Sequence, residues 1–393
     1  MRIRSTPHKR AWRPRGMNGP LSQRSLPLSH RGIDVTLFAA MRSNPLWMWA
    51  DLENTPHVLF LEPIIRRLRG LGWEVRVSAR PQAQTLDLAA HRDLAVRAIG
   101  LGDLEGLGAK VIGVVARASA LAAWILRQGR PALLVSCSRS ASLAALVLRI
   151  PGVALLDYEH AEQRVLAAGN RVLWLPDLLR SARLPPASLK IARYYEGLKE
   201  NLYLDGWRPD REAERRRLGV ADDERLVVSR PPAESAHYAS DRGGQLWIGV
   251  MRELRRRASY KVLIVARTPT QRESLARILG PGKDVEFLRR AVCGPALVGA
   301  ADLVIGGGGT MNREAAVLGV PVWSVFTGPT PLIDDRLADE GRLRWVRTDA
   351  ELAAALAADP PPPRLRRGPY PQGLTRIVEN IEARLKGLEG ARE

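Results

Sequence analysis

The chain has 393 residues, of which 46% are hydrophobic and 26% are charged. This is more residues than a domain with one hydrophobic core usually has, so the length fits two domains. The apolar content excludes a chain that is disordered throughout. The net charge of +19 favours anionic partners such as nucleotide phosphates, an acidic membrane surface or nucleic acid, although arginines spread over a solvated surface would give the same balance.

Residues 1–45 hold nine of the cations and one acidic residue, Asp34, and they show no hydrophobic period. We expect a disordered basic leader here, or an over-extended start with Met41 as the true initiator. The apolar piece Leu37–Met41 is too short for the core of a secretory signal, so we do not expect one.

Two longer apolar stretches, Val111–Leu126 and Ser140–Leu156, are each interrupted by arginine. We therefore predict that no segment crosses a bilayer. Only two cysteines occur, Cys137 and Cys293, both within apolar runs. This usage is typical of buried thiols in a reducing compartment, so the sequence predicts a cytoplasmic protein.

From Leu46 onward, short apolar strands alternate with helical segments. In the first half we predict elements at Leu46–Ala50, Val58–Leu71, Glu74–Ser78, Thr85–His91, Leu94–Ile99, Lys110–Gln128, Ala132–Ser136, Ala141–Arg149 and Val153–Leu156. This alternation predicts βαβ units around a parallel sheet. The rhythm breaks at Tyr194–Asp210, where we place a boundary between an N-terminal Rossmann-like domain, 46–205, and a C-terminal one, 206–359.

The second half shows the same alternation. We predict elements at Leu226–Ser229, Gln245–Arg257, Lys261–Ala266, Gln271–Leu279, Val285–Leu288, Gly294–Ala300, Leu303–Ile305, Met311–Leu318, Val320–Phe326, Leu332–Glu340 and Leu352–Ala358. Residues 360–393 follow as a proline spacer, Pro360–Pro363, and an amphipathic helix, Leu374–Leu388, that could return to the first domain. The fold class is thus α/β, with two parallel sheets that face a cleft.

The sharpest local signal is a strand, a glycine turn and a helix between Asp302 and Pro321. Gly306–Gly309 allow close approach of the backbone to a ligand, and the helix that opens near Thr310 offers free amides and a positive dipole end to an anion. Glu314, one turn inside this helix, is placed to accept hydrogen bonds from ribose hydroxyls. The alternative is a tight turn whose glycines serve packing alone.

Two common phosphate motifs are absent. The dinucleotide fingerprint would need a glycine where Met311 stands if counted from Gly306, and the Walker pattern fails because Gly282-Lys283 is followed by Asp284. The sequence therefore favours neither NAD binding nor ATP hydrolysis.

Arg230 and Arg267 each follow a predicted strand of the second domain. Ligands in open parallel sheets bind at the carboxyl ends of the strands, so both guanidinium groups could meet a pyrophosphate beside the glycine turn. Taken singly, either arginine could instead be a solvated surface charge.

In the first domain, Asp51 and His57 follow the strand Leu46–Ala50. Thr55 and Pro56 suit a helix start that faces the cleft, and His57 could act as a base toward an acceptor hydroxyl. A histidine that only packs the first turn would look the same.

A polar cluster, Asp157 to Glu162, follows the strand Val153–Leu156 and supplies Glu159 and His160 as further acid–base candidates. The alternative is a solvated acidic cap on the next helix. Asp157, His57 and His160 lack the spacing of a known metal site, so we expect no bound metal.

Five separated motifs resemble, in order, an archaeal and bacterial family known as domain of unknown function 354. They are Trp49–His57, Leu155–Ala161, Tyr194–Leu204, Ser229–Tyr238 and Gly306–Pro321. The resemblance covers the chain from about Leu46 to Val346. That family looks related to GT-B glycosyltransferases and UDP-N-acetylglucosamine 2-epimerases, which implies a GT-B-like fold of two Rossmann-like domains with the nucleotide in the C-terminal one.

The resemblance also implies site residues. Gly307, Gly308 and Gly309 match the glycine turn that holds phosphate in those relatives, and Glu314 matches their ribose-binding glutamate. The chain lacks the His-Arg-Glu-Asn stretch of the epimerases and has Ser229–Pro232 instead, which argues against epimerisation.

We therefore expect a metal-independent glycosyltransferase that uses a nucleotide-sugar donor, with UDP as the expected nucleotide and no further cofactor. His57, or Glu159 with His160, would deprotonate the acceptor, for which a lipid-linked molecule is one candidate. One alternative is a UDP-sugar 2-epimerase that uses Asp51, Glu159 and His160. Another is a non-catalytic protein held by its basic leader at an anionic membrane, on the inner face; few aromatic residues and no known motif argue against nucleic acid.

Overall fold

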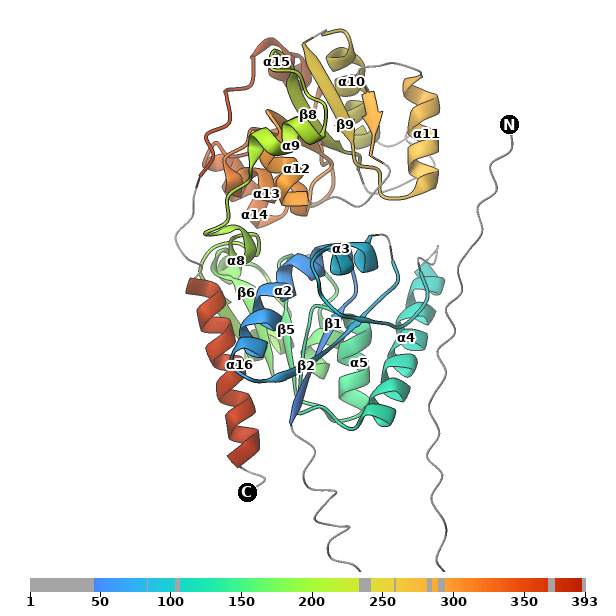
Figure 1. Ribbon diagram of the computed structural model, residues 1–393, viewed down its shortest axis with the longest axis vertical. Helices are drawn as coiled ribbons and strands as arrows, with labels where there is room; N and C mark the ends of the chain where they lie inside the picture. Colours follow the sequence, from blue (N-terminus) through green and yellow to red (C-terminus); the bar gives the residue numbers. More distant parts are fainter. Residues whose placement is uncertain are drawn as a thin grey trace, which may run out of the picture. The chain divides into compact units, whose positions relative to one another are not determined.

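The structure is a computed structural model that describes residues 46–82, 84–102, 107–232, 242–257, 259–280, 285–288, 294–366 and 372–390. The predicted leader, 1–45, and Cys293 lie outside these residues. Within them the chain forms two parallel sheets with helices between the strands, which is the α/β architecture predicted from the alternating pattern (Figure 1).

The first sheet has seven strands in the order β3-β2-β1-β4-β5-β6-β7. They are β1 Trp47–Leu52, β2 Glu74–Ala79, β3 Arg97–Ala98, β4 Leu133–Ser136, β5 Gly152–Leu155, β6 Val172–Pro176 and β7 Ala192–Tyr195. Its helices are α2 Thr55–Gly70, α3 Thr85–His91, α4 Leu107–Gln128, α5 Arg139–Val147, α6 Arg164–Gly169, α7 Pro186–Ile191 and α8 Asn201–Leu204, with a 3-10 turn, Asp177–Ser181, after β6. The pattern analysis predicted neither β6 nor β7.

The second sheet has six strands in the order β10-β9-β8-β11-β12-β13. They are β8 Arg225–Arg230, β9 Tyr260–Ile264, β10 Val285–Phe287, β11 Leu303–Gly306, β12 Val322–Ser324 and β13 Arg344–Trp345. Its helices are α9 Arg211–Arg217, α10 Arg242–Arg255, α11 Pro269–Leu279, α12 Gly294–Ala300, α13 Thr310–Leu318, α14 Leu332–Asp339 and α15 Asp349–Ala357.

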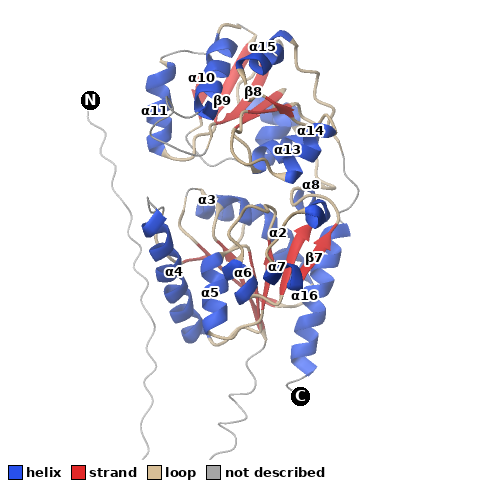
Figure 2. Cartoon of the chain, turned by 180° about the vertical axis from the view of Figure 1, so that it is seen from behind, coloured by secondary structure: helices blue, strands red, loops and turns tan. Residues whose placement is uncertain are grey.

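The seven-stranded sheet carries a core on each face. On one face, α2 packs together with the last helix, α16 Gln372–Gly390, and the buried side chains of Ile377 and Ile381 join those of β1 and β2. On the other face, α4 and α5 lie side by side and cover Trp47 and Trp49, whose rings meet Trp124 edge-on at 6.0 and 6.3 Å (Figure 2). Because both faces are covered, the sequences of the strands are continuous apolar runs.

The six-stranded sheet is also covered on both faces. Helices α12 and α13 bury Leu297 and Ala315 against one face, and α10 buries Trp247 and Met251 against the other. Local chemistry sets the helix ends: Thr268 accepts a hydrogen bond from the amide of Gln271 at the start of α11, and Gly319, at φ 79°, ends α13 in the left-handed conformation.

Helix α4 is long and apolar enough, over Val111–Gln128, to cross a membrane by length and composition. Its inner face is part of the domain core, where Leu121 and Ile125 are buried. Arg117, which interrupts the apolar stretch, is also buried on this face and pairs with Asp51.

Candidate active site

The glycine turn joins β11 to α13 at the centre of the second sheet. Gly306 is in register with Arg230 of β8, and the amide of Gly307 donates a hydrogen bond to the Arg230 carbonyl at 3.2 Å. Gly308 and Gly309 have φ of 86° and 90°, a region that side chains other than glycine rarely adopt.

Close packing explains why glycine is needed at two positions of this turn. A Cβ on Gly307 would lie 2.4 Å from the Cα of Pro232, and one on Gly308 would press against the Phe326 ring at 3.2 Å. A Cβ on Gly309, in contrast, would meet nothing within 4 Å. The first two glycines are thus required by the fold around them, whereas the side of Gly309 faces open space.

That space belongs to a cavity of about 500 Å³ lined from both sheets. The lining residues are Asn54, Pro56, His57, Phe60, Cys137, Asp157, Tyr158, Lys199, Arg267, Gly307, Gly308, Gly309, Thr310, Arg313, Phe326, Pro331 and Asp334. Most of them follow the carboxyl ends of β1, β4, β5, β7, β9, β11 and β12, which is where open parallel sheets bind ligands. The volume is that of a typical small-molecule site.

A charged cluster forms the floor of the cavity. Lys199 Nζ donates to Asp157 Oδ2 at 2.5 Å and to Thr310 Oγ1 at 3.0 Å. Arg313 donates to Asp157 Oδ2 at 3.3 Å and, through Nε, to Asp334 Oδ1 at 2.7 Å. Two cations thus balance two carboxylates, and Thr310 at the start of α13 is fixed by one of them.

The electrostatics keep this cluster ionised. Burial alone would raise the pKa of Asp157, but Lys199 and Arg313 lower it to about 2. Burial would likewise lower the pKa of Lys199, yet Asp157 and Glu200 outweigh it and raise the pKa. The charges of Asp157 and Lys199 therefore persist across the physiological pH range.

Arg230 and Arg267 form a pair of like charges beside the glycine turn. Arg230 ends β8, Arg267 follows β9, and these two strands are neighbours in the sheet. Burial, and then the proximity of Arg267, lower the pKa of Arg230 to about 10. Arg267 lines the cavity and Arg230 does not, and the two positive charges lie close enough to influence each other beside the glycine turn.

His57 lines the cavity, but its hydrogen bonding differs from what the predicted role as a base requires. Its Nδ1 accepts a hydrogen bond from the backbone amide of Glu53 at 3.3 Å, so the neutral ring carries its proton on Nε2. Burial lowers the pKa of His57, which favours this neutral form. Toward the cavity, His57 is therefore a hydrogen-bond donor. Cys137 lies nearby, where burial and Asp157 raise the pKa of its thiol and keep it protonated.

Glu314 is buried beside the cavity and is not one of its lining residues. Its Oε1 accepts a hydrogen bond from the Tyr203 hydroxyl at 2.9 Å, and its Oε2 faces Gly294. Burial raises the pKa of Glu314 to about 7. The ribose contact predicted for Glu314 stays a prediction.

The structure corrects the role predicted for Asp51. This carboxylate is fully buried and is held by Arg117, which donates to Oδ2 at 2.9 Å and to Oδ1 at 2.7 Å; the Ser78 hydroxyl also donates to Oδ1. Substrate cannot reach a carboxylate enclosed in this way. Asp51 instead ties β1 to α4.

Glu159 and His160 also take positions other than those predicted. Glu159 Oε1 accepts a hydrogen bond from the amide of Leu332 at 2.6 Å, and His160 Nε2 lies 3.4 Å from the Thr330 carbonyl. Neither side chain lines the cavity. Both hold the loop that precedes α14, so we no longer expect acid–base chemistry from them.

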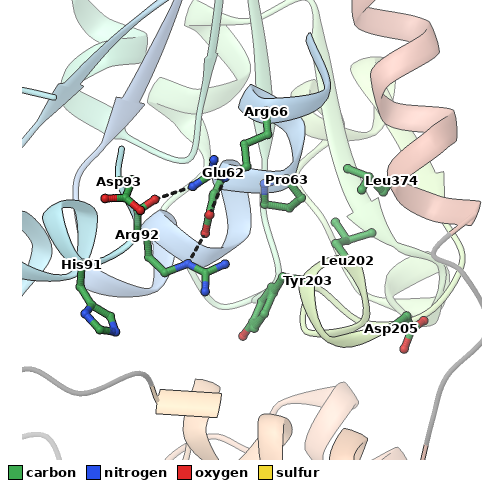
Figure 3. A pocket seen from close by; sticks show the side chains of 10 residues that line it. All are labelled: Glu62, Pro63, Arg66, His91, Arg92, Asp93, Leu202, Tyr203, Asp205 and Leu374. Carbon is green, nitrogen blue, oxygen red and sulfur yellow. Dashed lines mark hydrogen bonds and ion pairs between the residues drawn. The ribbon is translucent and has the colours of Figure 1, made fainter. Parts of the chain in front are cut away.

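A second cavity, of about 560 Å³, lies among α2, α3, α8 and α16 (Figure 3). Glu62 points between Arg66 and Arg92 and accepts a hydrogen bond from each, at 2.7 and 2.8 Å (Figure 3). In this second cavity a carboxylate therefore lies between the two arginines.

Lys199, Arg313 and Asp334 are site residues that the sequence reasoning missed. Lys199 comes after β7, a strand that was not predicted, so its place at a strand end could not be recognised. Arg313 lies one turn into α13, three residues after Thr310, and helical spacing alone would have placed it near the helix mouth.

Solved structures confirm the fold. A UDP-GlcNAc 2-epimerase of Methanocaldococcus jannaschii in complex with UDP-GlcNAc and UDP is 14% identical, with a TM-score of 0.64 over 86% of this chain and 100% of that one. S. aureus MnaA with UDP is 13% identical and has a TM-score of 0.63 over 87% of this chain and 97% of that one. The spinosyn forosaminyltransferase SpnP is 15% identical and has a TM-score of 0.51 over 89% of this chain and 100% of that one. The fold is thus that of GT-B glycosyltransferases and 2-epimerases.

An uncharacterised protein of Methanocaldococcus jannaschii is 24% identical over 305 residues, which cover 75% of this chain and 86% of that protein. The model of a family described as protein of unknown function (DUF354) matches residues 46–356. The cavity residues from Asn54 to Asp334 all fall within this match. The chain belongs to this family.

Proposed function

We propose that this protein is an enzyme that transfers a glycosyl group from a nucleoside-diphosphate sugar, with UDP as the expected nucleotide, to an acceptor without a bound metal ion. The observation that carries the proposal is the open side of Gly309, which faces a cavity that Arg267 also lines, with Arg230 close enough to Arg267 for their charges to interact. A diphosphate at this place would bind both guanidinium groups and the amides at the start of α13.

The chemistry follows from this position. As the bond between the sugar and the diphosphate breaks, negative charge grows on the leaving oxygen, and groups that already face it lower the barrier without reorganisation. Arg230, Arg267 and the helix end at Thr310 supply that stabilisation, which a metal ion supplies in other enzymes.

The side of the cavity formed by the first sheet would receive the sugar and the acceptor. His57 would donate its Nε2 proton in a hydrogen bond to the sugar and hold it in place. Asp157 is an ionised carboxylate of the cavity and would accept a hydrogen bond from the acceptor hydroxyl. It would orient this hydroxyl, whose proton would pass to the departing diphosphate as the new bond to the sugar forms.

A second candidate is 2-epimerisation of a UDP-sugar. The 2-epimerase of Methanocaldococcus jannaschii matches this chain with a higher TM-score, 0.64, than the forosaminyltransferase, 0.51. The same diphosphate contacts would serve either reaction, and the two differ in what happens to the donor when no acceptor is present.

The test is to incubate the full chain with UDP-, GDP-, dTDP- and CMP-sugars, with and without EDTA, and to follow the sugar by NMR. Glycosyl transfer predicts that one donor binds and stays intact until an acceptor is supplied, for which lipid-linked and soluble sugars are the candidates. A new sugar resonance from the donor alone would show epimerisation. If no nucleotide sugar or free UDP binds by calorimetry, both candidates fall.

A further inference from the structure

The outward face of α4 is apolar. Ile112, Val115 and Leu126 expose 68, 51 and 72% of their surface, and Val111 is exposed beside them. The exposed positions of this helix recur at helical spacing and, from Val111 to Leu126, carry no charge. Of the eleven large apolar residues that the described part of the chain exposes, six lie on α4 and the adjoining end of α5.

The segment that carries this face has charge of one sign. Residues 107–156, which run from α4 to the end of β5 and Leu156, contain six Lys and Arg and no Asp or Glu. Three exposed arginines lie near Leu126 and Val147: Arg127 in the last turn of α4, Arg130 just after α4, and Arg149 just after α5. Arg130 donates a hydrogen bond to the Arg149 carbonyl, so the loops that follow α4 and α5 lie next to each other.

The inner face of α4 fixes the helix to the domain. Leu121 and Ile125 are fully buried, and Arg117 is clamped to Asp51 by two hydrogen bonds of 2.9 and 2.7 Å. Removing this helix from the sheet would take Arg117 away from Asp51 and leave this carboxylate in the domain without its counter-charge. The helix can therefore meet a membrane only with its outer face, lying along the surface.

We propose that the outward face of α4 and the arginines at its carboxyl end dock on the surface of an anionic lipid bilayer. Val111, Ile112, Val115 and Leu126 would enter the boundary between head groups and acyl chains. Arg127, Arg130 and Arg149 would pair with lipid phosphates. This surface lies on α4 itself, outside the basic leader that the sequence analysis considered.

A second copy of the chain fits this face less well. Two such faces would each bring positive charge, and the segment that carries the arginines holds no carboxylate to neutralise it. An acidic bilayer supplies the missing negative charge and the apolar phase at once. The inference is independent of the proposed reaction, because it depends on no residue of the cavity.

The experiment is co-sedimentation of the full chain with vesicles of phosphatidylcholine alone and of an equal mixture of phosphatidylcholine and phosphatidylglycerol. We expect binding to the mixed vesicles that weakens with salt. The double variant Ile112→Asp, Val115→Asp should lose at least about tenfold in affinity, since each exposed apolar group adds roughly that factor when buried. The matched control Leu189→Asp, at a half-exposed leucine of α7, should bind as the unchanged protein does.

Circular dichroism of all variants verifies that they fold. Equal vesicle binding by the double variant and the unchanged protein would overturn the proposal, as would no binding to the acidic vesicles. So would self-association, measured by sedimentation, that the double variant abolishes without any vesicle binding. Binding of UDP, measured on the same samples, shows separately whether the proposed function holds.

Discussion

Lys199, which follows the last strand of the first sheet, donates a hydrogen bond of 3.0 Å to the hydroxyl of Thr310, the first residue of α13 in the second. The same ammonium group holds Asp157 at 2.5 Å. One side chain thus joins the carboxylate of the candidate site to the helix end that is expected to face the diphosphate. The position of that helix end therefore depends on a charge supplied by the other half of the molecule.

The first prediction concerns acid stability. The pKa of Asp157 in the folded protein, about 2, lies below its ordinary value of about 3.9. Its ion pairs therefore contribute stability above about pH 4 that is lost as the pH falls toward 2. Lys199→Met should raise this pKa toward its ordinary value and so reduce the stability that is lost between about pH 4 and pH 2, which urea unfolding at a series of pH values measures. Lys386→Met, at an exposed pair with Glu382, is the control and should leave the profile unchanged. Identical profiles for both variants would show that Lys199 does not set the charge of Asp157.

The second prediction separates backbone strain from ligand binding at the glycine turn. Gly309 and Gly72 have φ of 90° and 92°, and a Cβ on either would meet nothing within 4 Å. Replacement of either by Ala should cost roughly 1–2 kcal/mol of folding free energy, because alanine disfavours this conformation. Only Gly309→Ala should weaken UDP binding, by about tenfold or more in calorimetry, since its methyl group would occupy the cavity. Equal UDP affinity of the two variants would contradict the anion site.

The third prediction concerns Glu314. Burial raises its pKa to about 7, so the side chain is protonated below this pH and ionised above it. If the ionised form accepts a hydrogen bond from a ribose hydroxyl, UDP affinity should rise by about tenfold as the pH increases through 7. Glu314→Gln should bind more weakly and lack this rise, although the phosphate of UDP titrates equally with both proteins. Calorimetry on both sides of pH 7 measures the difference, and a parallel pH dependence would exclude Glu314 from the ribose contact.

The fourth prediction tests the structural role of Asp51. Asp51→Asn leaves the Arg117 guanidinium buried without its counter-charge, which should cost about 3–5 kcal/mol of folding free energy. Asp359→Asn, at an exposed carboxylate 3.5 Å from Arg225, should cost less than about 1 kcal/mol. Urea unfolding at pH 7 measures both. A small loss for Asp51→Asn would return this residue to the list of catalytic candidates.

Much of the fold was predictable because its strands are buried on both faces. Runs such as Leu133–Ser136 and Leu303–Gly306 are short, apolar and followed by turn residues, which is a strong signal. β7 was not predicted because Ala192–Tyr195 contains an arginine and two tyrosines, and its packing depends on the distant α16. β13 has two residues, too few for any periodicity.

The site was predicted less completely, for a physical reason. The glycine turn and Arg267 lie at the cavity because the position of a residue after a strand predicts the edge of the sheet. Whether a polar residue at that edge faces the cavity depends on its partners. Asp51 is enclosed by Arg117, sixty-six residues further along the chain, and Glu159 by the amide of Leu332, 173 residues further. No local pattern reveals such pairings.

The return of α16 to the first sheet has a consequence for biosynthesis. Leu374, Ile377, Val378, Ile381 and Leu385 complete a core that otherwise comes from the first half of the chain. During translation, the early half must wait with that apolar surface uncovered until the ribosome has also made α16. Nascent chains should therefore recruit chaperones at this surface, and a gene fragment that ends before α16 should yield insoluble protein.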